Sequence, residues 1–173
     1  MNNSLSNNCL SDIVIRPLVP EDRGIIDAFY VQMSAETRAL FNPKNHNRRR
    51  THRYLDGKIP NAEEFIAVIR HDRTETVAGY CFLWDCNLAI PWLGIAVSEQ
   101  WKGKGLGQHL ISFLIDHVKE AGGGGILLTT HVTNTRAQAL YEKMGFTFIG
   151  VHTSGEMLFL LRFPITAPER TVS

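Results

Sequence analysis

The sequence predicts a mixed α/β domain around one central sheet, and two observations carry this prediction. Segments with strand character alternate with amphipathic helical segments, in the order strand, helix, hairpin, strand, helix, strand, helix, hairpin. A length of 173 residues suits one domain with a single sizeable core. We therefore expect a folded domain over residues 12–164, with disordered polar tails at 1–11 and 165–173.

The first half of the chain is expected to hold a strand, a helix and a hairpin. Residues 13–15 alternate with their neighbours as a strand, and Pro20-Glu21-Asp22 places a proline and two acids where a helix begins. Residues 64–70 and 76–84 have the composition of two paired strands. The segment between this helix and the hairpin, residues 37–55, is expected to be a solvated basic loop.

The second half repeats strands and helices in alternation. Leu110, Leu114 and Val118 form one apolar stripe, which predicts an amphipathic helix after Gly107. Four consecutive glycines, 122–125, are expected to end that helix. The remaining predicted elements are strands at 91–97 and 126–132, a helix at 136–144, and a closing hairpin of 146–151 with 157–162.

Composition and charge exclude several classes of protein. A net charge of +1 is unlike the basic excess of a nucleic-acid-binding domain, so no nucleic acid is expected as a partner. No apolar run approaches the roughly 20 residues that span a bilayer, and the first residues do not resemble a signal peptide. Three cysteines without metal-type spacing indicate reduced thiols. These features favour a cytoplasmic protein without a membrane partner.

A glycine-rich junction between a strand and a helix is the most informative motif. The strand Ile95-Ala96-Val97 leads into Lys102-Gly103-Lys104-Gly105-Leu106-Gly107, which opens the long helix. Glycines let backbone N–H groups approach a ligand, and the first N–H groups of a helix lack internal partners and lie at its positive end. The junction therefore predicts a site for a phosphate or pyrophosphate.

The spacing of this motif excludes two common nucleotide sites. A P-loop would need a Ser or Thr after Lys104, and none follows. The three glycines have the spacing G-x-G-x-G, whereas a Rossmann fingerprint needs G-x-G-x-x-G with an acidic residue about 20 positions on.

Two further segments complete an ordered set. Asn134-Thr135-Arg136-Ala137 follows the glycine loop, and Tyr141-Glu142-Lys143-Met144-Gly145-Phe146 comes next. The combination resembles the GNAT superfamily of N-acetyltransferases, whose acyl-CoA signature is roughly Arg/Gln-x-x-Gly-x-Gly/Ala, then Asn, then Tyr-Glu-Lys-x-Gly-Phe. The resemblance covers residues 95–150 tightly and 13–162 loosely. Lys102 departs from it, since the family usually has Arg or Gln there; the positive charge is kept but the planar fork is not.

The resemblance implies a GNAT-like fold and a cosubstrate. The expected sheet is twisted and mostly antiparallel, is flanked by helices, and has splayed fourth and fifth strands. Pantetheine of acetyl-CoA would lie between these strands and pair with main-chain groups of Ile95 and Val97. The Val97 N–H would lie near the thioester carbonyl. The full expected cofactor-binding set is Ile95, Ala96, Val97, Lys102, Gly103, Lys104, Gly105, Leu106, Gly107, Gln108, Asn134, Ala137 and Tyr141.

Tyr141 is the expected general acid. Similar enzymes place this tyrosine near the CoA sulfur, where it protonates the departing thiolate. Reference pKa values of roughly 10 for a phenol and 8.5 for a thiol are close enough for this transfer. The alternative is a tyrosine that only packs in the core. Asn134 is expected to contact CoA or form a turn.

The general base is the open question. The strand 91–97 holds no carboxylate, and Thr129 occupies the fifth-strand position where some similar enzymes carry Glu. His131 lies two residues on, hence on the same expected strand face, and a histidine can accept a proton near neutral pH. An ordinary core or surface histidine is the alternative. The weaker candidates are Asp85, Glu36 and Glu99. No metal is expected, since the histidines show no ligand spacing.

The acceptor is expected to be an amine of a small molecule or a protein. Six basic residues and no acid occur between Thr37 and Leu55, and in similar enzymes this segment covers the acceptor site. The cluster could attract an anionic acceptor, although a solvated basic loop is the commoner explanation for such a segment. The overall prediction is an acyl-CoA-dependent N-acyltransferase that could form a homodimer. A CoA-binding regulatory module without turnover is the second hypothesis.

Overall fold

The computed structural model describes residues 10–164, so most of the two expected tails lies outside the described residues. Leu10–Asp12 form a short 3-10 helix, and Leu10 packs against the core. The last two residues of the expected N-terminal tail are thus part of the folded structure.

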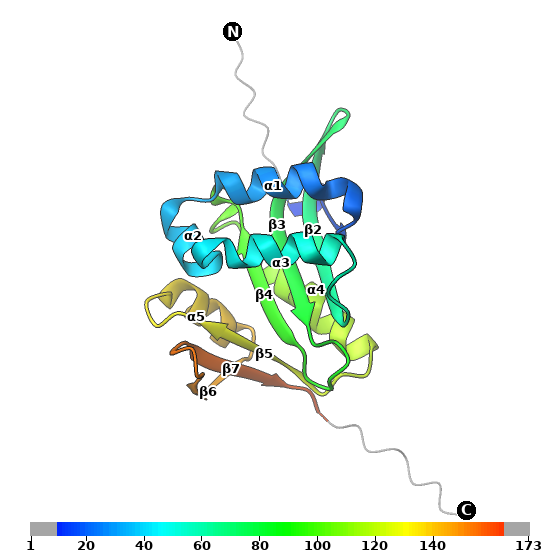
Figure 1. The fold of residues 1–173 in the computed structure, drawn as a ribbon. Coiled ribbons are helices and arrows are strands. Elements are labelled where there is room, and N and C mark those ends of the chain that lie inside the picture. The colour runs from blue at the N-terminus through cyan, green and yellow to red at the C-terminus, as the bar shows by residue number, and fades with distance from the viewer. Residues whose placement is uncertain (1–9, 165–173) are drawn as a thin grey trace, which may run out of the picture.

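The described chain forms one seven-stranded sheet in the order β1-β2-β3-β4-β5-β7-β6 (Figure 1). All neighbouring strands are antiparallel except β4 and β5, which are parallel. This confirms the predicted mixed α/β domain with a mostly antiparallel sheet. The strands are β1 (Ile13–Pro17), β2 (Ala62–His71), β3 (Thr74–Trp84), β4 (Trp92–Val97), β5 (Gly125–Thr130), β6 (Thr147–Val151) and β7 (Met157–Arg162).

Helices cover both faces of the sheet. In Figure 1, α1 and α3 cross in front of β2 and β3, and α4 lies behind the strands. The helices are α1 (Arg23–Gln32), α2 (Ala35–Phe41), α3 (His46–Leu55), α4 (Leu106–Glu120) and α5 (Thr135–Lys143), with short 3-10 helices at Leu10–Asp12, Pro20–Asp22, Pro43–Asn45 and Glu99–Trp101.

The alternation of side chains along the strands divides the core into two clusters. Tyr80, Phe82 and Ala96 face α1 and α3, whereas Leu83 and Leu93 face α4. The first side of the sheet is called the α1–α3 side below, and the second the α4–α5 side.

The expected basic loop at 37–55 is wrong, because this segment is mostly helical. Ser34 caps α2 by accepting a hydrogen bond from the Thr37 N–H at 3.2 Å. In α3 only Thr51 and Leu55 are buried, so the helix lacks most of the periodic apolar residues that would predict it from the sequence. Polar contacts hold α3 instead, among them the bond from Arg48 Nε to Asp27 Oδ1 at 2.8 Å.

Other element boundaries lie close to the predicted ones, with two consequences for the site. The strand β5 ends at Thr130, so the predicted strand at 126–132 is too long at its end. The helix α4 begins at Leu106, which places Gly107 inside the first turn.

The strands β4 and β5 separate soon after they meet. They share a single pair, Trp92 with Leu127, and the Leu127 N–H donates to the Pro91 carbonyl at 3.0 Å. Beyond this pair the two strands have no ladder between them. The predicted splay of the fourth and fifth strands is therefore confirmed.

Candidate active site

The splayed part of β4 has backbone groups without a strand partner. Ala96 stands opposite Tyr80 on β3, and the Ser98 N–H donates to the Ala78 carbonyl at 2.8 Å. Since hydrogen-bonded and non-hydrogen-bonded pairs alternate in an antiparallel ladder, the N–H and C=O groups of Ile95 and Val97 point away from β3, toward β5. Among the described residues, β5 has left before it can pair with them. The gap between β4 and β5 is therefore bordered by an unpaired edge of β4, although β4 is an inner strand of the sheet.

The glycine loop lies at the end of β4 and exposes amide groups. Gly103 and Gly105 have φ values of +76° and +86°, a backbone conformation that residues other than glycine rarely adopt. The His109 N–H donates to the Gly105 carbonyl at 3.0 Å, which is the first bond of α4 to reach back to the loop. The amides from Gly105 to Gln108 have no acceptor within residues 10–164. Unpaired N–H groups at a helix N-terminus are suited to bind an anion.

Gly107 allows α4 to approach the strand edge. A Cβ atom there would lie 3.1 Å from Leu140 and 3.8 Å from Ile95 and Val97. The glycine therefore keeps the helix start close to β4 and α5. The neighbouring Leu106 is fully buried, so only its backbone can face a ligand.

The two lysines of the loop differ in their surroundings. Lys102 Nζ contacts Glu99 Oε2 at 2.7 Å and donates to Thr37 Oγ1, so its charge already has a carboxylate partner. Lys104 Nζ lies 5.3 Å from the centre of the buried Trp101 ring, and its side chain is exposed. Of the two, Lys104 has the ammonium group that remains open to an anion.

The start of α5 adds a positive charge that sequence reasoning missed. Asn134 caps this helix, because its Oδ1 accepts a hydrogen bond from the Ala137 N–H at 3.3 Å. The Arg136 guanidinium lies 3.4 Å from the position that a Gly103 Cβ would occupy. The sequence did contain a signal for this charge, namely an arginine two residues after the helix cap. In the first turn of α5, this arginine projects toward the glycine loop.

Tyr141 lies in the core on the α4–α5 side of the sheet. It is 6% exposed and packs against the rings of Phe146 and Phe159, with centroids 5.9 and 6.1 Å away. Burial raises the pKa of Tyr141 to about 12, so the hydroxyl keeps its proton at neutral pH. This hydroxyl has no hydrogen-bond partner among the described residues. It is a protonated donor held by aromatic packing, which suits either role predicted for it.

The glycine loop, β4 and Tyr141 thus offer unpaired amides suited to an anion, an extended polar edge and a proton donor. The profile of the acetyltransferase (GNAT) family matches residues 19–146. The chain belongs to this family.

Curated relatives match only part of the GNAT domain. A mycothiol acetyltransferase from Corynebacterium glutamicum (strain R) is 34% identical over 84 residues, which cover 41% of this chain and 29% of that protein. A putative [ribosomal protein bS18]-alanine N-acetyltransferase from Bacillus subtilis is 32% identical over 69 residues, covering 40% and 46%. The chain thus spans less than half the length of either relative.

A solved GNAT structure matches nearly the whole fold. Spermidine N-acetyltransferase from Vibrio cholerae, in complex with CoA and spermine, superposes with a TM-score of 0.66 at 17% identity. The match covers 87% of this chain and 94% of that one. At this identity the likeness supports the fold alone.

His131 does not lie on the strand face where it was expected. Since β5 ends at Thr130, His131 is exposed in the following turn. Its Nδ1 accepts the Thr133 N–H at 3.2 Å and lies 2.8 Å from Thr133 Oγ1. The predicted position of His131 beside Thr129 on the strand is therefore wrong, and its Nδ1 accepts a hydrogen bond in a local turn.

The weaker carboxylate candidates are poorly suited to accept a proton. Lys102 and Thr37 hydrogen-bond Glu99 and lower the pKa of that carboxyl to about 2, which makes it a weak base. Asp85 is exposed in the turn after β3 and has a positive φ of 58°. Glu36 is exposed in the first turn of α2. None of the three lies on β4 or β5.

Most arginines of the basic segment have partners within the GNAT domain. Arg38 donates to the carbonyls of Val31 and Met33, both at 3.1 Å. Arg48 pairs with Asp27, as described above. The Arg50 guanidinium carbon lies 3.6 Å from the centre of the Trp84 ring. These contacts indicate that the segment serves the fold first.

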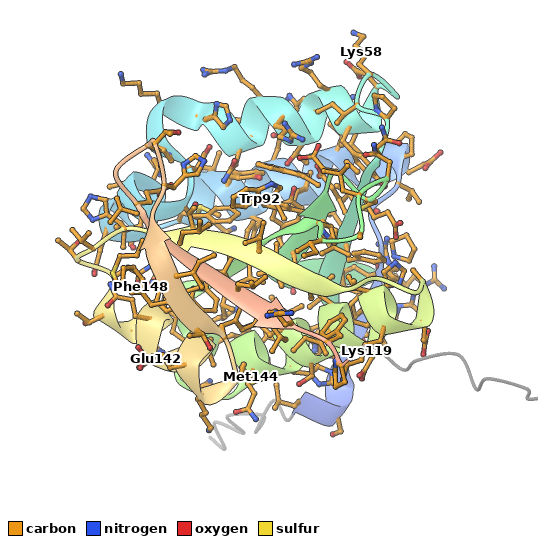
Figure 2. All side chains as sticks on the ribbon, turned by 90° about the horizontal axis from the view of Figure 1, so that it is seen from below. Lys58, Trp92, Lys119, Glu142, Met144 and Phe148 are labelled. Atoms are coloured by element: carbon orange, nitrogen blue, oxygen red, sulfur yellow. The ribbon has the colours of Figure 1, made fainter. Side chains whose placement is uncertain are left out.

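An aromatic stack forms the α1–α3 side of the site. The Phe82 and Trp84 rings are parallel, with centroids 4.1 Å apart, and Arg50 covers the other face of Trp84. A Cβ on Gly94 would come within 2.0 Å of the Phe82 ring, so β4 needs glycine at this point. Figure 2 shows Trp92 on the same side of the sheet, between the strands and α3.

A buried carboxylate behind this stack was also missed. Glu64 on β2 is 1% exposed and accepts the Tyr80 hydroxyl hydrogen. Its Oε1, Arg50 Nε and Trp84 Nε1 are buried without a hydrogen-bond partner in the described chain. A polar residue within an apolar strand was the only available signal.

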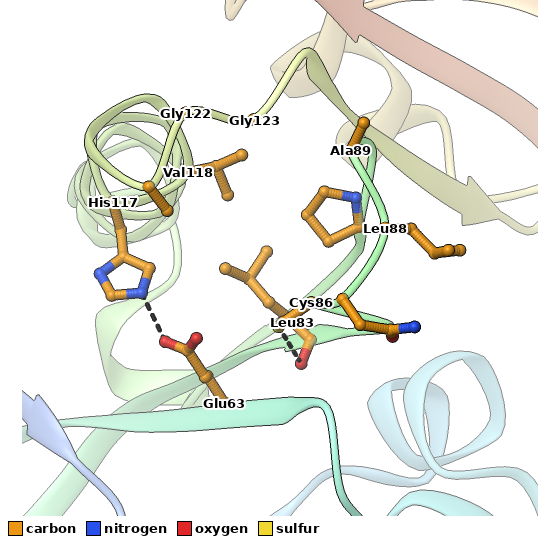
Figure 3. A pocket seen from close by; sticks show the side chains of 12 residues that line it. Glu63, Leu83, Cys86, Leu88, Ala89, His117, Val118, Gly122 and Gly123 are labelled. Carbon is orange, nitrogen blue, oxygen red and sulfur yellow. Dashed lines mark hydrogen bonds and ion pairs between the residues drawn. The ribbon is translucent and has the colours of Figure 1, made fainter.

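The hollow in Figure 3 belongs to a different part of the molecule. It lies where β4 starts and α4 ends, between Pro91 and Gly123, and the hydrogen bond between His117 Nε2 and Glu63 Oε2 closes one side (Figure 3). The anion site is at the other end of α4. No group of His, Cys, Asp or Glu in residues 10–164 is arranged to hold a metal, and no helix there is long and apolar enough to cross a bilayer.

Proposed function

We propose that this GNAT protein transfers an acetyl group from acetyl-CoA to a primary amine by direct attack of the amine on the thioester. The unpaired backbone edge of β4 beside an amide-rich loop carries the proposal. An extended chain of amides such as pantetheine can pair with that edge as an added strand would. The loop at one end of the edge suits the pyrophosphate of the same molecule.

Each part of the site has a proposed role. The amides of the glycine loop and of the first turn of α4 hold the pyrophosphate, with Lys104 and Arg136 adding positive charge. Ile95 and Val97 pair with pantetheine, and the Val97 N–H polarises the thioester carbonyl. Tyr141 gives its proton to the departing thiolate. The remaining predicted cofactor-binding residues shape the loop or offer backbone groups: Ala96, Lys102, Gly103, Gly105, Leu106, Gly107, Gln108, Asn134 and Ala137.

The acceptor is proposed to be an amine of a small molecule or of a protein. The names of the relatives point to both classes, since one is a mycothiol acetyltransferase and another a putative [ribosomal protein bS18]-alanine N-acetyltransferase. We place the reaction in the cytoplasm, where the free thiols of Cys81 and Cys86 would stay reduced.

Two measurements on the full chain test this proposal. Calorimetric titration with acetyl-CoA measures binding, and thiol release over a panel of amines, including spermidine and an alanyl peptide, measures transfer. We expect binding and amine-dependent thiol release. Binding without release for any amine would favour the regulatory module, and no binding would overturn the proposal.

A further inference from the structure

We take the α1–α3 side of the sheet as the acceptor side, because α3 belongs to the segment that covers the acceptor site in similar enzymes. On this side β4 holds no carboxylate. Its side chains on the α1–α3 side are Trp92, Gly94 and Ala96, none of which can take a proton from an amine. Glu64 faces the same side but belongs to β2, two strands away, or about 10 Å at the usual strand spacing. A base for the acceptor has to come from another element.

Thr129 marks the opposite wall of the gap. Trp92 and Leu127 are paired, so two residues further along both strands are Gly94 and Thr129. Leu128 is buried on the α4–α5 side, and its neighbour Thr129 therefore faces the α1–α3 side, as Trp92 does. The Thr129 hydroxyl thus lies at the acceptor side of the splayed strands.

A carboxylate reaches this hydroxyl from the turn between β6 and β7. Thr129 Oγ1 donates to Glu156 Oε2 at 2.9 Å, and Ser154 Oγ donates to the same oxygen at 3.1 Å. Glu156 is half-buried, and its Oε1 has no hydrogen-bond partner among the described residues. One oxygen is therefore fixed while the other remains available.

The turn that carries Glu156 is anchored at the mouth of the gap. The His152 N–H donates to the Glu156 carbonyl at 2.8 Å, and the Gly155 N–H donates to the His152 carbonyl at 2.9 Å. The His152 ring meets the Trp92 ring edge-on, with centroids 5.7 Å apart. Contacts to both β4 and β5 hold the carboxylate over the place where these strands separate.

We propose that Glu156 is the catalytic residue that binds the acceptor as a cationic primary ammonium and takes its proton. The proposal rests on the proposed function and names the substrate class for that site. Some similar enzymes carry Glu at the position of Thr129 on β5. Here Glu156 supplies the carboxylate, and the hydrogen bond from Thr129 holds its side chain in place. A carboxylate at this place favours a cationic acceptor over an anionic one.

The proton balance of the step is complete. The ammonium gives one proton to Glu156 Oε1, its nitrogen forms the N–C bond with the thioester carbon, and the C–S bond breaks. Sulfur takes the proton of the Tyr141 hydroxyl. The second proton lost by nitrogen passes through solvent to Tyr141, and Glu156 returns its proton to solvent as the amide leaves.

The test compares Glu156→Gln with wild type and with Glu120→Gln, an exposed carboxylate at the end of α4. With the amine that wild type acetylates fastest, kcat/KM of Glu156→Gln at neutral pH should fall by roughly 10²–10⁴-fold. The Kd for acetyl-CoA should stay at the wild-type value, and Glu120→Gln should match wild type. Raising the pH toward the pKa of the amine should restore part of the rate, because more amine is then already deprotonated.

Two further variants control for misfolding and for the titration of the neighbouring His152. Thr129→Val keeps the carboxylate but removes its hydrogen bond, and should give a smaller loss of kcat/KM. His152→Asn removes the imidazole, and should keep the wild-type dependence on pH. Wild-type kcat/KM in Glu156→Gln, or a loss without recovery at high pH, would overturn the role of Glu156. Thiol release by wild type with none of the amines would remove the proposed function, and this role with it.

Discussion

Tyr80 donates its hydroxyl hydrogen to Oε2 of Glu64 at 2.6 Å, between the sheet and the helices α1 and α3. The contact is the end of a buried chain, since Thr51 Oγ1 lies 2.9 Å from both the Tyr80 and the Tyr30 hydroxyls. Burial raises the pKa of Glu64 to about 7, even though the hydrogen bond from Tyr80 and the charge of Arg50 oppose the shift. The carboxyl group therefore titrates near neutral pH.

This shift predicts a stability that falls as pH rises. In the folded state the Glu64 carboxyl keeps its proton up to about pH 7, whereas in the unfolded chain its pKa has the usual value of 4.5. The stabilisation is fully present below pH 4.5 and is lost as pH rises through 7. Glu64→Gln should remove this loss. Urea unfolding at about pH 5 and about pH 8 gives the free energy of unfolding of both proteins. Between these pH values it should fall less for Glu64→Gln than for wild type. Equal falls in both proteins would contradict the shift.

Tyr141→Phe should lower kcat while leaving the affinity for acetyl-CoA nearly intact. The reason is that only the departing thiolate needs the proton, and general acid catalysis is worth roughly 10²–10⁴-fold. Steady-state rates with the best amine and calorimetric titration with acetyl-CoA measure the two quantities. Phe146→Leu serves as the control for packing, because it alters the ring contact without removing a hydroxyl. A wild-type kcat for Tyr141→Phe would assign the tyrosine to the core only.

Gly105→Asp should weaken acetyl-CoA binding at least tenfold, or about 1.4 kcal/mol, because a carboxylate would stand beside the pyrophosphate. Strain at the positive φ of Gly105 would also contribute. Gly105→Asn separates the two effects, since Asn has nearly the same shape, tolerates this conformation and carries no charge. Calorimetry should give a clearly smaller loss for Asn than for Asp. Equal losses would mean that backbone strain, not charge, limits binding.

The basic segment should affect stability more than substrate binding. Arg50→Met should lower the free energy of unfolding by roughly 1–3 kcal/mol, because it removes the cation over Trp84 and the charge that faces Glu64. The exposed Arg49 and Arg53 provide the matched test of charge. Their double reversal to Glu should leave the KM values for acetyl-CoA and for the amine unchanged at low salt. A higher KM for the amine alone would support the anionic acceptor that the sequence suggested.

Local patterns in the sequence predicted the loop, strand and helix that the proposed cofactor half of the site uses. The glycine loop, the strand before it and the Asn134 and Tyr141 segments are contiguous, and each has a backbone or chemical reason for its residues. The splay of β4 and β5 was available only through the resemblance to the family, because no single-strand pattern records where two strands part. The helix α3 was missed since its stability depends on polar contacts that have no periodic signal.

The acceptor half depends on distances that no local pattern contains. Glu156 is 27 residues from Thr129 in the chain, and their contact is set by the pairing of β5 with β7. His131 was favoured by an alternation that stops one residue before it, because β5 ends at Thr130. The absence of a carboxylate from β4 and β5 can therefore be seen in the sequence, whereas the proximity of Glu156 to Thr129 appears only in the fold.

The unpaired edge of β4 has a consequence for how the protein behaves without its ligand. A strand with free N–H and C=O groups is a template for pairing with another chain, and proteins usually protect such edges. Here the edge lies inside the sheet, where charged side chains cannot shield it and where Ile95 and Val97 also offer apolar surface. A ligand that fills the gap would protect it, and at a concentration of 100 Kd it would add about 2.7 kcal/mol to the stability of the folded state. The cosubstrate would then also suppress aggregation, so the unliganded protein should be the form most prone to associate through β4.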